Sequence, residues 1–450
     1  MMCQVTTVSD EIVVVQMGAQ LKTRKGETDT MAIQPKLLGG FLLLVTLLIS
    51  LPCLVYAAEV NGIYTEDSTK DLGELTKIDF FKGLKFRGWI DGYFVNNFNR
   101  PNRAVVDANK GKSVVQGRAV TIEGRTFDIH SDSFTLSLAE IELEKVPGMG
   151  EVGFKLDLAV GETQDTIVNT IRGSLGPDTA HDSVLGIDRN FQHASISYLA
   201  PVGQGIRLDF GKFVTHIGAE TIESIKNNNY SHAFFYTYGI PFQDTGLRVH
   251  YDWSSTFYTE LYALNGWNVT VDNNSGKTFG PSIGWSPSPK FSFYLNYLVG
   301  PEQDNNNGNY RHLIDTQVYL NPIDPLNIGF NFDYGFEFNN PKAILAGTGR
   351  NAEWWGLTGY LRYKVTDKVE PVIRAEYYRD ADAFTTGVKQ SLQGYTLTVN
   401  YKLGVTKGTG LLLRPEIRYD KSSAPFFSDR SGFQRTNNQT TVGIGLVYYW

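Results

Sequence analysis

The sequence has almost no cysteine. Of 450 residues only Cys3 and Cys53 carry a thiol, and both lie upstream of the point where we expect the mature chain to begin. A disulfide scaffold, a zinc–thiolate site and a cysteine nucleophile are therefore excluded. Basic blocks are missing as well: the formal net charge is -6, and no run of Lys or Arg is long enough to follow a phosphate backbone. We therefore expect no nucleic-acid partner.

Long apolar runs are missing too, except for one at residues 37–51. That run follows Lys36 and ends near Ala57 and Ala58, which is the layout of a secretory signal peptide. We expect residues 31–58 to be this signal peptide, 1–30 to be an upstream start-site artefact, and 59–79 to be a short polar segment forming a periplasmic helix or a plug. The alternative for the apolar run is an uncleaved anchor helix. Since no later segment is apolar enough for a membrane helix, a helical membrane protein is excluded.

Catalytic constellations are also absent. Residues 111–113 read like the end of a phosphate-binding loop, but Val106 stands where the earlier glycine is needed. The G-x-S-x-G string at 280–284 falls inside a predicted strand, with no helix after it. A hydrolase built into a barrel could pair Ser195 or Ser197 with His250, yet nothing marks these residues out. We expect no enzyme, with no catalytic residue, metal ligand or cofactor.

What the chain does contain is alternation with a period of two. In residues 326–336 one face carries only apolar or aromatic side chains, and the other carries Asn327, Gly329, Asn331 and Asp333. This is typical of a strand that lies between two different solvents. The pattern recurs in sixteen segments: 84–99, 133–145, 150–161, 190–201, 205–217, 243–253, 255–266, 277–286, 289–300, 311–321, 325–337, 352–365, 367–380, 391–404, 408–421 and 437–450.

The links between these segments alternate between long and short. Residues 100–132, 162–189 and 218–242 are long links, whereas 201–204 and 287–288 are short turns. Membrane barrels have this asymmetry, with tight periplasmic turns and longer extracellular loops. The sequence therefore predicts an all-β fold: a transmembrane, antiparallel, up-and-down β-barrel of about 16 strands over residues 80–450. A soluble, lectin-like sandwich is the weaker alternative, because it has no reason to alternate its links.

The last strand ends on an aromatic residue, Trp450, preceded by apolar residues at every second position. Outer-membrane barrels commonly end in this way, and the segment resembles the signal that the barrel-assembly machinery reads. We expect that machinery and outer-membrane lipid to be partners. Aromatic residues near other strand ends would supply the girdles at the lipid interface.

Residues 211–253 resemble the central region of the OmpL-like family of outer-membrane β-barrel porins. The resemblance rests on Gly211-Lys212-Phe213, Ile217-Gly218-Ala219-Glu220, Asn229-Tyr230-Ser231, Pro241-Phe242 and Thr245-Gly246, with residues 82–99 similar to the first strand. It implies a pore-type barrel in the outer membrane of a Gram-negative bacterium. We expect passive diffusion of small hydrophilic solutes and ions. General porins are often trimeric, so both a monomer and a homotrimer remain open.

If the apolar faces meet lipid, charged side chains line the lumen and set ion selectivity. The expected lumen charges are Lys155, Asp157, Arg207, Asp209, Arg248, His250, Asp315, Asp333, Arg362, Arg374, Glu376, Lys402, Arg414, Glu416 and Arg418. The alternative, without a role in selectivity, is that these charges pair with one another.

The third long link, 218–242, is too aromatic for an exposed tip. Our hypothesis is that it folds into the barrel and forms a constriction, with two acids opposite four arginines of the later strands. These candidate selectivity residues are Glu220, Glu223, Arg362, Arg374, Arg414 and Arg418. A non-conducting barrel that serves as a surface anchor or adhesin through its outer loops is the alternative function.

Overall fold

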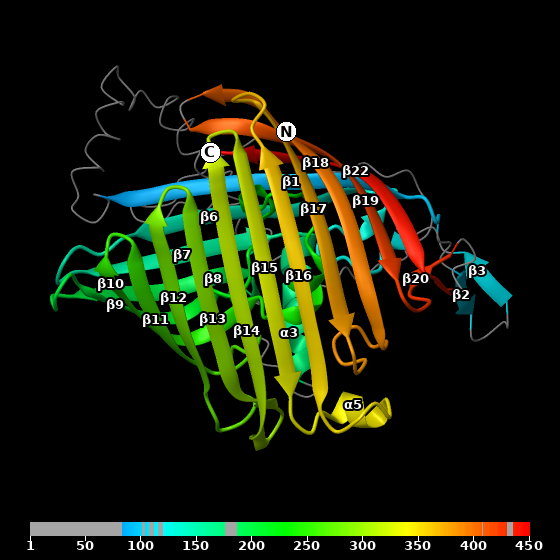
Figure 1. Ribbon diagram of the computed structural model, residues 1–450, viewed down its shortest axis with the longest axis horizontal. Helices are drawn as coiled ribbons and strands as arrows, with labels where there is room; N and C mark the ends of the chain where they lie inside the picture. Colours follow the sequence, from blue (N-terminus) through cyan, green and yellow to red (C-terminus); the bar gives the residue numbers. More distant parts are fainter. Residues whose placement is uncertain are drawn as a thin grey trace, which may run out of the picture. The chain divides into compact units, whose positions relative to one another are not determined.

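The computed structural model describes residues 83–100, 104–107, 112–115, 120–175, 187–406, 408–429 and 435–450. The expected artefact, signal peptide and polar segment (1–30, 31–58 and 59–79) lie outside the described residues. The described chain forms one closed barrel of sixteen antiparallel strands in sequence order (Figure 1).

Each of the sixteen predicted segments is a barrel strand. Their bounds are β1 Leu84–Asn97, β6 Phe134–Lys145, β7 Val152–Val160, β8 Phe191–Ala200, β9 Ile206–Val214, β10 Gln243–Ser254, β11 Phe257–Leu264, β12 Thr278–Ser288, β13 Phe291–Gln303, β14 Asn306–Ile323, β15 Leu326–Glu337, β16 Ala352–Tyr363, β17 Val369–Asp380, β18 Gln390–Thr406, β19 Thr409–Ser422 and β22 Asn438–Tyr449. The predicted fold class, an antiparallel β-barrel, is confirmed.

The barrel closes between its first and last strands. β1 pairs with β6 on one side and with β22 on the other. At the seam, Gly88 N–H donates to the Trp450 carbonyl (3.1 Å), and Trp450 N–H donates to the Gly88 carbonyl (3.0 Å). Closure leaves no unpaired sheet edge, as a strand-built membrane wall requires.

The period-two pattern sorts side chains to the two faces of the wall. In β15, Phe330 and Phe332 are 43% and 40% exposed on the outer surface, whereas the intervening Asn331 and Asp333 are 6% and 1% exposed inside. Apolar side chains in contact with lipid and polar side chains inside are the arrangement of a membrane barrel.

One predicted long link is wrong. Residues 301–310 were expected to form a loop, but β13 runs to Gln303 and β14 starts at Asn306, and these two residues pair. Asp304 and Asn305 alone make the turn, with Asn305 at φ 54°. Asn tolerates this left-handed conformation better than most other residues.

The other long links carry small elements of their own. The hairpins are β2 (Ala104–Asp107) with β3 (Lys112–Val115), β4 (Val120–Thr121) with β5 (His130–Ser131), and β20 (Phe427–Ser428) with β21 (Arg435–Thr436). The helices are α3 (Glu162–Leu175), η1 (Ile187–Asn190), η2 (Ser224–Lys226), α4 (Phe234–Gly239) and α5 (Pro341–Leu345), of which α5 lies beyond the ends of β15 and β16 (Figure 1). Within the described ranges, none of the helices has the length and apolarity to cross a membrane.

Candidate functional site

The link between β9 and β10, residues 215–242, lies inside the barrel, and we call it the inner loop. Its main chain bonds to inward-facing side chains of distant strands: Tyr230 N–H donates to Glu416 of β19 (2.9 Å), and Phe234 N–H donates to Glu376 of β17 (2.5 Å). β17 is eight places from β9 in the ring of sixteen strands. The inner loop therefore crosses the lumen and docks on the opposite wall.

Aromatic packing explains why the inner loop is so apolar. Phe234, Phe235 and Tyr236 are buried in one cluster with Trp354 and Tyr378 of the wall, among other residues. The Trp354 indole N–H also donates to the Gly239 carbonyl (3.1 Å). Burying these rings inside the barrel removes a large apolar area from water, which stabilises the docked position.

The wall has a glycine where the loop approaches most closely. A Cβ added at Gly445 of β22 would lie 2.1 Å from the ring of Tyr230. Tyr230 in turn donates its hydroxyl to Asp91 of β1 (2.9 Å). Only glycine leaves room for this ring against the wall.

Glu220 and Arg374 meet, as the constriction hypothesis expects. The Arg374 guanidinium donates to the Glu220 carboxylate at 2.9 Å. The same carboxylate accepts from the Tyr360 hydroxyl (3.0 Å) and from Ala233 N–H (2.7 Å). With Arg374 0% and Glu220 6% exposed, this is a buried, hydrogen-bonded ion pair that ties the inner loop to β16 and β17.

Arg414 and Arg418 also bind the inner loop, but through its main chain. Arg414 donates to the carbonyls of Ser224 and Asn227, the second at 2.8 Å. Arg418 donates to the His232 carbonyl (2.6 Å) and pairs with Asp420 (2.6 Å). Both guanidinium groups are at most 1% exposed, so they hold the loop rather than meet a solute.

The structure does not bring Glu223 and Arg362 to this group. Glu223 accepts from Gln192 of β8 (2.9 Å) and pairs with Lys226 (3.2 Å). Arg362 has a 40% exposed side chain and lies 3.9 Å from Glu370 on the neighbouring strand. The sequence grouped them as inward-facing charges, but it could not show where along the lumen each one lies.

A second inner segment, residues 122–128 between β4 and β5, was not singled out from the sequence. Its Arg125 pairs with Asp128 (2.9 Å) and donates to Thr441 of β22 (2.6 Å). Phe127 packs edge-on against His232 of the inner loop, with ring centroids 4.9 Å apart. Burial raises the pKa of the Asp128 carboxyl, which Arg125 opposes, and burial lowers the pKa of the His232 imidazole. The sequence did contain a signal for this segment: Phe127 is an aromatic residue in the link 100–132, which was expected to be an exposed extracellular loop.

Three ion pairs inside the barrel have a partly exposed cation and a buried carboxylate. The Lys155 side chain is 23% exposed while its partner Asp157 is 1% exposed (3.2 Å). Arg207 and Arg248 are similarly half-buried beside a buried Asp209 (2.9 and 2.7 Å). These strands, β7, β9 and β10, are not neighbours of β17 and β19, on which the inner loop docks.

The serine–histidine pairs considered for a hydrolase are not formed. His250 Nδ1 lies 3.0 Å from Glu260, while Ser197 donates to Asp209. Ser195 bonds instead to His193 (2.8 Å), its neighbour on the same face of β8. No triad of serine, histidine and acid built on His250 is therefore assembled by the described residues.

Comparisons with known proteins give one family match and several similar solved structures. The family model described as "Putative beta-barrel porin-2, OmpL-like" matches residues 83–449. Similar solved structures include the outer membrane channel DcaP of Acinetobacter baumannii, with 12% identity, 82% of this chain and 97% of that chain covered, and a TM-score of 0.46. Others are an anion-selective porin from Comamonas acidovorans (13% identity, 82% and 99% covered, TM-score 0.48) and OprB of Pseudomonas putida (12%, 84% and 97%, 0.48). No curated protein matches the sequence.

The family match spans the whole barrel, from β1 to β22. The apolar outer surface, the closed sheet and the polar interior are the features that a bacterial outer membrane requires of such a protein. The protein is located in that membrane, and the chain belongs to the OmpL-like family of β-barrel porins.

Proposed function

We propose that the protein lets small hydrophilic solutes and ions diffuse passively across the outer membrane, without a covalent step or a cofactor. The observation that carries this proposal is the closed ring of sixteen strands with polar residues on its inner face. Barrels of about sixteen strands enclose an aqueous channel. Half-buried lysine and arginine side chains on β7, β9 and β10 are consistent with water in that channel.

We further propose that the inner loop narrows this channel. Glu220, Arg374, Arg414 and Arg418 act by holding the loop on the wall, since all four are buried. Ion selectivity then depends on charged side chains that keep contact with water. These are Arg362, from the candidate residues, and the cations of β7, β9 and β10.

The test is single-channel recording of the purified protein in a planar bilayer, with the reversal potential measured under a salt gradient. Stable current steps support an open pore, and the sign of the reversal potential identifies the preferred ion. If the protein shifts its gel mobility on heating but carries no current, the barrel fold is supported and the proposed passive diffusion is refuted.

One observation favours the alternative of a non-conducting surface anchor or adhesin. The inner loop and residues 122–128 fill one side of the lumen so completely that three wall arginines are at most 1% exposed. Absence of current in the planar bilayer, together with binding of the intact protein to a surface ligand through its outer loops, would establish that function instead.

We also propose two partners. The C-terminal strand β22, ending at Trp450, serves as the segment that the barrel-assembly machinery reads, and a Trp450 deletion should reduce insertion. One of the similar structures is a trimer form of OmpT from Vibrio cholerae. A homotrimer of this chain is tested by native mass spectrometry in detergent.

A further inference from the structure

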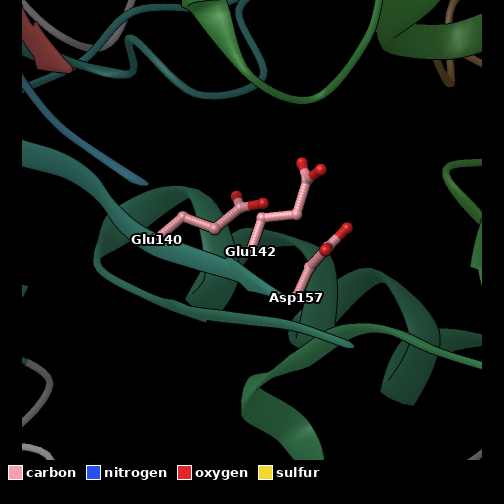
Figure 2. A group of neighbouring side chains, drawn as sticks. All are labelled: Glu140, Glu142 and Asp157. Carbon is pink, nitrogen blue, oxygen red and sulfur yellow. The ribbon is translucent and has the colours of Figure 1, made fainter. Parts of the chain in front are cut away.

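Three acidic side chains gather on the inner wall at β6 and β7 (Figure 2). Glu140 and Glu142 lie on β6, and Asp157 lies on β7 directly opposite Glu142. One carboxylate oxygen from each residue lies within 4.8 Å of the other two. The residues are 1%, 2% and 0% exposed. Two acids spaced two residues apart on a strand look like an ordinary polar face, so the sequence alone did not single them out.

Glu140 is the unusual member of this acidic cluster. Neither of its carboxylate oxygens has a hydrogen-bond partner, and no described cation forms an ion pair with it. Glu142, in contrast, bonds to Arg87 and has Lys155 and Lys226 at 3.8 and 3.7 Å. Figure 2 shows the Glu140 side chain extending toward Glu142, so its free oxygens are directed into the cluster. A buried carboxylate without any partner is costly unless a ligand compensates it.

The surrounding charges do not balance. The carboxylates outnumber the cations by five to four, and Lys85 pairs only with Glu144, at the edge. The groups counted are Glu140, Glu142, Glu144, Asp157 and Glu223 against Lys85, Arg87, Lys155 and Lys226. The acids are therefore in excess, and a bound cation would offset that negative charge.

The oxygen spacing suits a calcium ion. Calcium binds carboxylate oxygens at about 2.3–2.6 Å, so two oxygens on opposite sides of it lie roughly 4.6–5.2 Å apart, whereas magnesium at about 2.0–2.1 Å needs roughly 4.2 Å or less. The three oxygens lie within 4.8 Å of one another, which allows all of them to contact one calcium ion. We propose that Glu140, Glu142 and Asp157 bind one calcium ion.

The neighbouring lysines leave room for this ion. The side chains of Lys155 and Lys226 are 23% and 39% exposed toward the lumen, so their ammonium groups can move into water when the ion binds. Lys226 belongs to the inner loop, pairs also with Glu223 and lies over the Trp89 ring, 4.9 Å from its centroid. The calcium ion therefore lies where the inner loop passes β6 and replaces the links from Lys226 and Lys155 to the cluster.

Trp89 makes the site measurable. It lies on β1 directly opposite Glu140 and is also buried. Terbium(III) is close to calcium in size and emits when a nearby tryptophan is excited. We therefore titrate the purified full-length protein in detergent, after removal of divalent ions with EDTA, with terbium and compete it with calcium and with magnesium.

We expect saturating emission at one terbium per chain, displaced by calcium before magnesium. Trp89→Phe should lose most of this emission while calcium still binds, as followed by isothermal titration calorimetry. Glu140→Gln should weaken binding by more than about tenfold, because it removes a ligand rather than a supporting contact. Asp333→Asn is the matched control, since Asp333 of β15 is equally buried and also without a hydrogen-bond partner, yet lies outside the cluster.

Wild-type affinity in Glu140→Gln, or no stoichiometric binding by the native protein, would overturn the proposal, and a proton on Glu140 would then be the compensating charge. Displacement by magnesium before calcium would overturn the choice of ion. Heat-shifted gel mobility verifies that each variant is folded. Since binding is measured without any current, failure of this site and failure of the pore function remain distinguishable.

Discussion

Replacing Arg374 with methionine should release the inner loop from the wall. The substitution removes the hydrogen bond to Glu220 (2.9 Å), the hydrogen bond to the Ser231 carbonyl (2.5 Å) and the ion pair with Glu376 (3.4 Å). It leaves Glu220 buried without a cation, whereas Glu376 keeps its ion pair with Arg418 (3.3 Å). Removing one partner of a buried ion pair costs about 3–5 kcal/mol, and we expect a loss of this size in the free energy of unfolding.

The measurement is urea-induced unfolding of the protein in lipid vesicles, followed by tryptophan fluorescence. Arg362→Met is the control, because Arg362 is 40% exposed and its only carboxylate neighbour among the described residues is 3.9 Å away; we expect it to cost less than about 1 kcal/mol. Adding Glu220→Gln to Arg374→Met should cost less than the sum of the two single changes, since the residues act on one another directly.

Once it is released from the wall, the inner loop should also become cleavable by protease in the folded barrel. The conductance of the barrel should change as well. If Arg374→Met unfolds at the same urea concentration as Arg362→Met and its loop resists protease, the buried ion pair does not hold the loop, and the reasoning is refuted.

Three further predictions concern other parts of the barrel. Burial lowers the pKa of His216, beyond the end of β9, to about 4. Because the unfolded chain takes up the proton first, the free energy of unfolding should fall by at most about 3 kcal/mol as pH drops from about 6.5 toward 4. His216→Phe should flatten this dependence in unfolding experiments at several pH values. Gly445→Ala should displace Tyr230 and cost about 1–3 kcal/mol, whereas Gly359→Ala, where a Cβ meets nothing closer than 3.7 Å, should change the melting temperature little. Arg362→Gln removes a water-accessible positive charge, so the reversal potential should shift toward cations; an unchanged potential would show that this arginine does not face the ion path.

The contacts of the six candidate selectivity residues show where sequence reasoning stops. Glu220 and Arg374 are 154 residues apart and could be grouped only because both were placed on the lumen side. The sequence cannot report height along the barrel axis, so Glu223 and Arg362 were grouped with them although they lie elsewhere. The sequence also could not show which side chains are buried. The composition of the link favours an inner loop, but it does not indicate that the wall arginines beneath that loop lose contact with water.

The alternation of side chains within each strand is a local property, and it determined the strand positions and the inward and outward faces. Together with the alternation of long and short links, it also determined the membrane barrel. A strand exposed to lipid on one face and to a polar lumen on the other must alternate, so adjacent residues are enough to identify it. The tertiary structure decided what fills the lumen: the docking of residues 215–242 and 122–128, the room left by Gly445, and the convergence of Glu140, Glu142 and Asp157. These contacts join residues that only the closure of the ring brings together, and no local pattern encodes such distances.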